Sequence, residues 1–270
     1  MSHTSRRDFV KTASLGLMSG AILPTIAVPS YAKSAVPFEL GIASYTFRQF
    51  RMEKTIEMVK RVGIRHVAFK SFHLPLDATD AAIRETKTYV SNEGINLYGG
   101  GVIYMKSEAE VNQAFEYAQK AGMKIIIGVP NHELLPLVDQ KVKEYNISVA
   151  IHNHGPGDKL YPSPESAYER IKNLDKRIGL CVDIGHTQRI GIDPSDSVKK
   201  FKDRVLDIHI KDVTQSSPEG TTCEVGRGVI DIPKFLRTCK KIQYRGIVAL
   251  EYEKDAEDPL AGVAESIGYI

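Results

Sequence analysis

The chain has 270 residues, of which 42% are hydrophobic and 26% are charged, as in an ordinary globular protein. Its formal net charge of only +3 argues against a nucleic-acid partner, because such proteins neutralise phosphates with a clustered basic face. Its 3 cysteines, Cys181, Cys223 and Cys239, have irregular spacing, which excludes a disulfide framework.

The first predicted element is an export signal over residues 1–32. The twin arginine Arg6-Arg7 precedes an apolar stretch at 13–28, and a small-x-small site ends at Ala32. This order is typical of a Tat-type signal peptide, so we expect cleavage after Ala32 and a periplasmic or secreted location. The apolar stretch is short and is interrupted by glycine and proline, so we expect no stable membrane span in the mature protein. An uncleaved anchor is the alternative.

Beyond the signal, helix-like segments alternate with short β-branched runs. Strands are predicted at 39–44, 65–70, 96–102, 124–129, 148–153, 178–183, 206–210 and 246–251. These runs are apolar on both faces, as expected of parallel strands that helices cover. Amphipathic helices are predicted at 53–62, 80–90, 109–121 and 138–145.

Two further helices are predicted from their start signals. Ser163-Pro164 and Asp193-Pro194 each combine an N-cap residue with a proline at the first helical position. Strand and helix units of this length and number predict an α/β fold, a single (β/α)₈ TIM barrel over residues 33–270. An open doubly wound sheet is the alternative, but no G-x-G-x-x-G follows the first strand.

Polar residues gather at the predicted strand ends. Six of the seven histidines after the signal lie at or just beyond the C-terminal end of a strand, which is the rim where such barrels place their chemistry. The last four strands end in His152-Asn153-His154, Asp183-Ile184-Gly185-His186, His209-Ile210-Lys211-Asp212 and Glu251-Tyr252-Glu253. Taken singly, each polar residue is explained as a rim or capping residue. Together they need a partner in the barrel interior, and a metal ion with nitrogen and oxygen ligands supplies one.

Other residues near the rim are candidates for substrate binding. They are Lys70, His73, Tyr104, His132, Arg189 and Arg227. The segment 214–223 is rich in serine, threonine and glycine, and we expect it to form a mobile loop over the barrel mouth.

The four strand-end segments resemble those of the xylose isomerase-like TIM-barrel superfamily of sugar phosphate isomerases and epimerases, over essentially the whole mature chain. The resemblance implies one divalent ion held by His152, Asp183, His209 and Glu251, with manganese expected and magnesium, cobalt or zinc as alternatives. The epimerases of this superfamily have a catalytic glutamate where this chain has His152, so their two-carboxylate proton shuttle is not implied. Strand alternation puts His152 and His154 on one face and leaves the choice of ligand between them open.

The expected function is metal-dependent isomerisation or epimerisation of a sugar or keto-sugar. The ion polarises a carbonyl, and a base removes the neighbouring C–H proton to give an enediolate. Glu251, His154, His186 and Lys211 are the candidates for proton transfer. Loss of a leaving group would instead make the enzyme a lyase or hydratase, acting on a keto-sugar or 3-keto-glycoside.

Two further alternatives belong to other functional classes. A non-catalytic periplasmic sugar-binding protein is one, and a nuclease related to endonuclease IV is the least supported. The expected partner is a small carbohydrate, with free sugars preferred over sugar phosphates because no glycine-rich phosphate loop is evident. The oligomeric state stays open.

Overall fold

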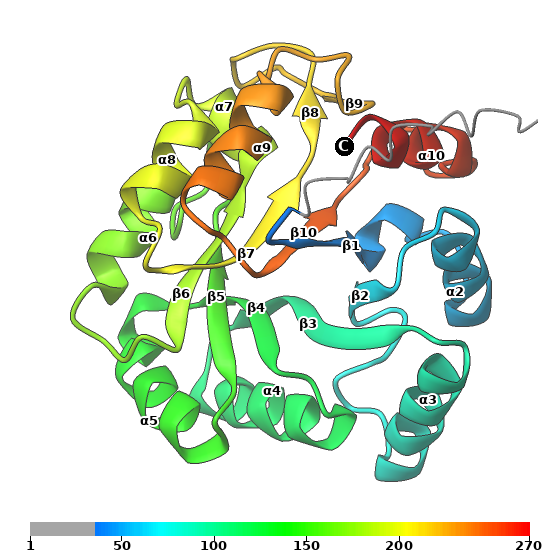
Figure 1. Cartoon of the computed structure of the whole chain (residues 1–270). Helices are drawn as coiled ribbons and strands as arrows, with labels where there is room; N and C mark the ends of the chain where they lie inside the picture. Colours follow the sequence, from blue (N-terminus) through cyan, green and yellow to red (C-terminus); the bar gives the residue numbers. More distant parts are fainter. Residues whose placement is uncertain (1–35) are drawn as a thin grey trace, which may run out of the picture. The chain divides into compact units, whose positions relative to one another are not determined.

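Eight parallel strands form a closed barrel within residues 36–270, which are the residues that the computed structural model describes. They are β1 (Glu39–Ala43), β2 (His66–Phe69), β3 (Asn96–Met105), β4 (Ile125–Pro130), β5 (Ser148–His152), β6 (Ile178–Asp183), β7 (Val205–Ile210) and β10 (Ile247–Leu250). Around the barrel their order is β1-β10-β7-β6-β5-β4-β3-β2 (Figure 1). The predicted (β/α)₈ fold is confirmed, and β3 runs three residues further than predicted. The predicted export signal lies outside the described residues.

Helices surround the barrel (Figure 1). They are α2 (Met52–Arg61), α3 (Asp80–Asn92), α4 (Glu108–Ala121), α5 (Leu135–Tyr145), α6 (Pro164–Ile171), α7 (Ile184–Arg189), α8 (Pro194–Lys200), α9 (Ile232–Lys241) and α10 (Leu260–Tyr269), with 3₁₀ turns η1 (Ser44–Phe47) and η2 (His132–Leu134). The predicted starts of α6 and α8 are confirmed, because Ser163 and Asp193 accept hydrogen bonds from the backbone N–H groups of Ser166 and Ser195. Within the described residues, no helix has the length and apolar character needed to cross a membrane.

Two layers of buried side chains hold the barrel together. The outer layer lies between strands and helices; in α9, for example, Ile232, Phe235 and Cys239 follow the helical repeat and are fully buried. The inner layer is a separate cluster of Ala43, Ala68, Tyr98, Ile127, Ala150, Cys181 and Ala249. Because side chains alternate along a strand, His152 and Asp183, which lie two positions after Ala150 and Cys181, also face the barrel interior, at its C-terminal end.

The segment 214–223, predicted as a mobile loop over the barrel mouth, forms the loop and the second strand of a small hairpin. β8 (Asp212–Val213) pairs antiparallel with β9 (Thr222–Cys223), and the Thr214 N–H donates to the Thr221 carbonyl at 2.9 Å. The Asp212 carboxylate fixes the hairpin base by accepting hydrogen bonds from four backbone N–H groups, those of Val213, Gly226, Gly228 and Ile230. The hairpin therefore forms a defined wall beside the barrel mouth.

Candidate functional site

Four side chains that were predicted as metal ligands meet at the C-terminal end of the barrel. His152 and Asp183 are the last residues of β5 and β6, His209 is on β7, and Glu251 directly follows β10. The strand register sets Asp183 beside His209. One ligand atom from each of the four lies within 4.8 Å of the others, and all four residues are buried. The parallel barrel thus concentrates two imidazoles and two carboxylates in one place.

The atoms of this cluster face one another closely. His152 Nε2 lies 3.1 Å from His209 Nδ1 and 3.5 Å from Asp183 Oδ2, and His209 Nδ1 lies 3.5 Å from Glu251 Oε2. Asp183 Oδ2 is fully buried and has no hydrogen bond within residues 36–270, although it forms an ion pair with Lys211 at 3.0 Å. Nitrogen and oxygen lone pairs that converge in this way in a buried place fit a divalent cation, which takes imidazole and carboxylate ligands.

Protonation states support the same fit. Burial lowers the pKa of His152 to about 3, so its imidazole is neutral at physiological pH. Burial opposes ionisation of Glu251, but Lys211 and His209 outweigh it and hold the pKa of that carboxyl well below its usual range. In Asp183 burial is likewise outweighed, here by His186 and Lys211, and the pKa is lowered. Burial lowers the pKa of His209 too, but the neighbouring Glu251 outweighs burial and raises it. The cluster therefore presents the neutral imidazole of His152 beside ionised carboxylates, and these are the forms that bind metals.

Lys211 lies beside the carboxylates of the cluster. Its Nζ is 2.6 Å from Glu251 Oε2 and 3.0 Å from Asp183 Oδ2, and it also contacts Glu253 Oε1. Burial disfavours the ammonium, but the three carboxylates outweigh it and raise the pKa of Lys211 well above its usual range. Sequence reasoning did not include Glu253 among the site residues, although its position two residues after Glu251 was a usable indication.

The structure distinguishes His152 from His154. His152 lies in the cluster, whereas His154 lies beyond the end of β5, with its Nε2 3.1 Å from the Tyr104 hydroxyl and its ring stacked on that of Tyr104. Its Nδ1 lies 3.9 Å from Asp158 Oδ2. Burial lowers the pKa of His154, which favours a neutral ring able to accept a proton.

An inner pocket of about 390 Å³ opens onto this cluster. It is lined by Tyr45, Lys70, Val102, Tyr104, His152, His154, His186, Glu251 and Glu253. Lys70 Nζ donates to the Val102 carbonyl at 2.5 Å, and burial lowers the pKa of this lysine. The predicted substrate-binding residues Lys70 and Tyr104 and the predicted proton-transfer residues His154 and His186 thus share one pocket.

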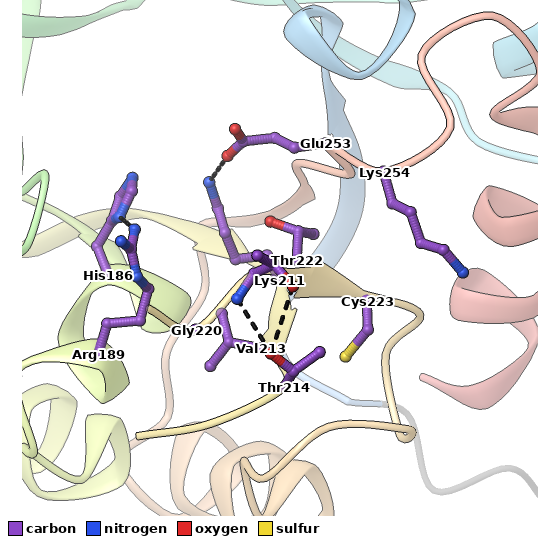
Figure 2. Close-up of a pocket in the computed structure, with 11 residues that line it drawn as sticks. His186, Arg189, Lys211, Val213, Thr214, Gly220, Thr222, Cys223, Glu253 and Lys254 are labelled. Atoms are coloured by element: carbon purple, nitrogen blue, oxygen red, sulfur yellow. Dashed lines mark hydrogen bonds and ion pairs between the residues drawn. The ribbon is translucent and has the colours of Figure 1, made fainter. Parts of the chain in front are cut away.

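An outer pocket of about 510 Å³ lies beside the β8–β9 hairpin (Figure 2). Its lining comprises His186, Arg189, Lys211, Val213, Thr214, Gly220, Thr221, Thr222, Cys223, Glu253 and Lys254. Arg189 was predicted to bind substrate, and it points into this region next to His186 (Figure 2). Burial lowers the pKa of His186.

Three predicted substrate-binding residues line neither of these two pockets. His73 is buried and contacts Ser44 Oγ at 2.8 Å and Thr55 Oγ1 at 3.0 Å. His132 Nε2 lies 3.0 Å from the Leu160 carbonyl. Arg227 is exposed and forms an ion pair with Glu265. In all three, polar side-chain atoms contact hydrogen-bond or ion-pair partners within the protein.

Comparison with known proteins gives a family. A family model described as xylose isomerase-like TIM barrel matches residues 46–270. The chain is 25% identical to the rhizopine catabolism protein MocC of Rhizobium meliloti over 131 residues, covering 43% of this chain and 40% of MocC. It is 23% identical to the putative L-ribulose-5-phosphate 3-epimerase SgbU of Haemophilus influenzae over 276 residues, covering 98% of this chain and 80% of SgbU. The matched segment thus spans only about two fifths of MocC.

Solved structures share the fold. The IOLI protein with a bound zinc atom superposes with a TM-score of 0.70 at 17% identity, covering 85% of this chain and 96% of IOLI. The probable 3-DHS dehydratase AsbF of Bacillus anthracis gives a TM-score of 0.69 at 13% identity, covering 86% of this chain and 98% of AsbF. At these identities the likeness shows the barrel architecture.

Proposed function

This chain belongs to the xylose isomerase-like TIM-barrel family, and on that premise we propose that it is a divalent-metal-dependent isomerase or epimerase of a sugar or keto-sugar. The observation that carries the proposal is the convergence of four buried ligand groups and several proton-transfer groups on one pocket. The 3-epimerase name of SgbU and the zinc atom of IOLI agree with it.

The metal would be held by His152, Asp183, His209 and Glu251. When bound, a divalent ion polarises a sugar carbonyl and acidifies the neighbouring C–H bond. Manganese is the proposed ion, with magnesium, cobalt and zinc as alternatives, because mixed imidazole and carboxylate ligands suit all of these.

The side chains around the pocket supply the proton transfer. His154 is neutral and presents an imidazole from the β5 end, while Glu251 and Glu253 follow β10 on another part of the rim. Lys211 donates to both carboxylates and so holds them in position. Epimerisation needs a group that removes the proton and one that returns it. His154 therefore takes the part that a strand-5 carboxylate would otherwise play.

A lyase or dehydratase is the second candidate. It is favoured by one observation: the β5 position in the ligand cluster is His152, so the cluster has one carboxylate fewer than an epimerase with glutamate there. The same proton removal, followed by loss of a leaving group at the next carbon, gives elimination. The probable dehydratase AsbF has the same fold.

The test is solvent exchange with metal-loaded protein. A panel of keto-sugars, oxidised glycosides and aldoses is incubated in heavy water, and deuterium is located by NMR and mass spectrometry. We expect label at the carbon next to the carbonyl, with an epimer or an eliminated product distinguishing the two candidates. His154→Asn should keep the metal and lose exchange, whereas Glu251→Gln should lose both. Tight binding of a sugar with neither turnover nor exchange would instead show a binding protein.

A further inference from the structure

The outer pocket adjoins the inner pocket at the barrel mouth. His186 and Glu253 line both pockets, and Lys211 bridges Glu251 in the inner pocket to Glu253 at the junction. Volumes of about 390 and 510 Å³ each lie within the range of small-molecule sites. A single sugar ring that reaches the four predicted ligands lies in the inner pocket and leaves the outer pocket unfilled.

Both walls of the outer pocket are held in place. The hairpin wall is anchored by the four hydrogen bonds that the Asp212 carboxylate accepts. The α7 wall is tied to the hairpin because Arg189 Nη2 donates to the Pro218 carbonyl at 2.5 Å. This pocket is thus built by tertiary hydrogen bonds, as expected of a preformed binding site.

The lining offers both hydrogen-bond donors and acceptors. Arg189 Nε is buried and has no hydrogen-bond partner among residues 36–270, and Glu253 supplies a carboxylate. Hydroxyl groups come from Thr214, Thr221 and Thr222. A sugar hydroxyl both donates and accepts, so it matches such a mixed lining. Lys211 is already paired with Glu253, and Lys254 with Glu224 at 2.8 Å, so two of the three cations in the lining are neutralised.

We propose that the outer pocket is a subsite for a second, neutral sugar ring, so that the substrate is a glycoside of at least two rings. Its reacting ring lies in the inner pocket, and the ring attached to it contacts Arg189, Glu253 and the threonine hydroxyls. The assignment of the reacting ring rests on the proposed function. The subsite itself rests on the geometry and chemistry of the outer pocket.

The test places a bulky side chain from the hairpin into the outer pocket. Thr222 is half-buried on β9 and lines the pocket (Figure 2), so Thr222→Phe places a ring in that space. Gln215→Phe is the matched control, because Gln215 is exposed on the same hairpin and lies outside the lining. The probes are glucose and galactose against sucrose, trehalose, cellobiose and lactose, each also as its keto form. Binding to the metal-loaded protein is measured by titration calorimetry.

We expect at least one disaccharide to bind wild type about tenfold or more tightly than its component monosaccharide. Thr222→Phe should remove this advantage while monosaccharide affinity stays within about twofold, and Gln215→Phe should retain it. Thr222→Leu, which adds less volume, should act in the same direction and serves if the phenylalanine variant does not fold. Three results would each overturn the subsite. Wild type could bind no disaccharide more tightly than its monosaccharide, Thr222→Phe could weaken the binding of monosaccharides and disaccharides equally, or Gln215→Phe could weaken disaccharide binding as much as Thr222→Phe does.

The two proposals fail separately. If keto-monosaccharides exchange deuterium but Thr222→Phe does not change the tighter binding of disaccharides, only the subsite is overturned. If Thr222→Phe removes the tighter binding of disaccharides but the protein exchanges deuterium with none of the sugars, the subsite is supported and the isomerase or epimerase function is overturned.

Discussion

Replacement of Lys211 by methionine removes the cation that compensates three carboxylates. The ammonium lies 3.0 Å from Asp183 Oδ2 and 2.6 Å from Glu251 Oε2 and contacts Glu253, and the lysine side chain is only 2% exposed. Methionine keeps much of the volume but none of the charge. Removing one partner of a buried ion pair costs about 3–5 kcal/mol, because the remaining charge stays buried without compensation. For a domain of this size that corresponds to a Tm lower by roughly 6–20 °C in the presence of a chelator.

A bound divalent ion should restore this stability. In wild type the ion meets Asp183 and Glu251 oxygens that Lys211 already contacts, whereas in Lys211→Met it meets uncompensated carboxylates. We therefore expect manganese or zinc to raise the Tm of the variant more than that of wild type. Linkage adds about 2.7 kcal/mol when the free ion is at 100 times its Kd. Thermal unfolding followed by circular dichroism, with chelator and then with increasing metal, measures both effects.

Lys234→Met is the control for the loss of a lysine. Lys234 pairs with Asp193 on the surface, where both side chains are well exposed, so its removal should change neither the Tm nor the metal response measurably. If Lys211→Met unfolds at the wild-type temperature in chelator, the electrostatic reasoning fails. If it is destabilised but metal raises its Tm no more than that of wild type, Lys211 does not compete with a cation at Asp183 and Glu251. If metal raises neither Tm, the four predicted ligands do not bind a cation.

Two further predictions concern stability. Asp212→Ala should lower the free energy of unfolding by at least about 3 kcal/mol in urea titrations, because four backbone N–H groups lose their acceptor; a loss below about 1 kcal/mol would contradict this. Burial lowers the pKa of His73 below its ordinary 6.5, so its stabilising effect is full above pH 6.5 and declines as the pH falls toward the lowered folded-state pKa. The stability difference between wild type and His73→Gln should therefore shrink from about pH 7.5 to about pH 5, and a constant difference would refute it.

Local sequence was enough to predict the barrel and a polar site at its C-terminal rim, and the family resemblance implied the four side chains that form the buried cluster. Backbone conformation over a few residues can be predicted from local signals. These signals are the apolar runs and the helix caps Ser163 and Asp193, each followed by a proline. Once the strands are parallel and closed into a barrel, their C-terminal ends must meet at one rim. The cluster that His152, Asp183 and His209 form with Glu251, which directly follows β10, is therefore a consequence of strand order.

Only the tertiary structure shows that His152, and not His154, lies in the buried cluster. The alternation rule applies within a strand, but β5 ends at His152, so the direction of the His154 side chain depends on the loop and on its contact with Tyr104. The position of Glu253 beside Lys211 has the same origin, because both residues lie beyond the ends of their strands.

The roles of the other polar residues likewise required the folded chain. His73 meets Ser44, which is 29 residues away, and the Asp212 carboxylate orders backbone up to 18 residues further along the chain. A sequence pattern reports which side chains can bind a ligand. Whether their polar atoms are already hydrogen-bonded to distant backbone or side chains is set only when the packing of the barrel and its loops brings those partners together.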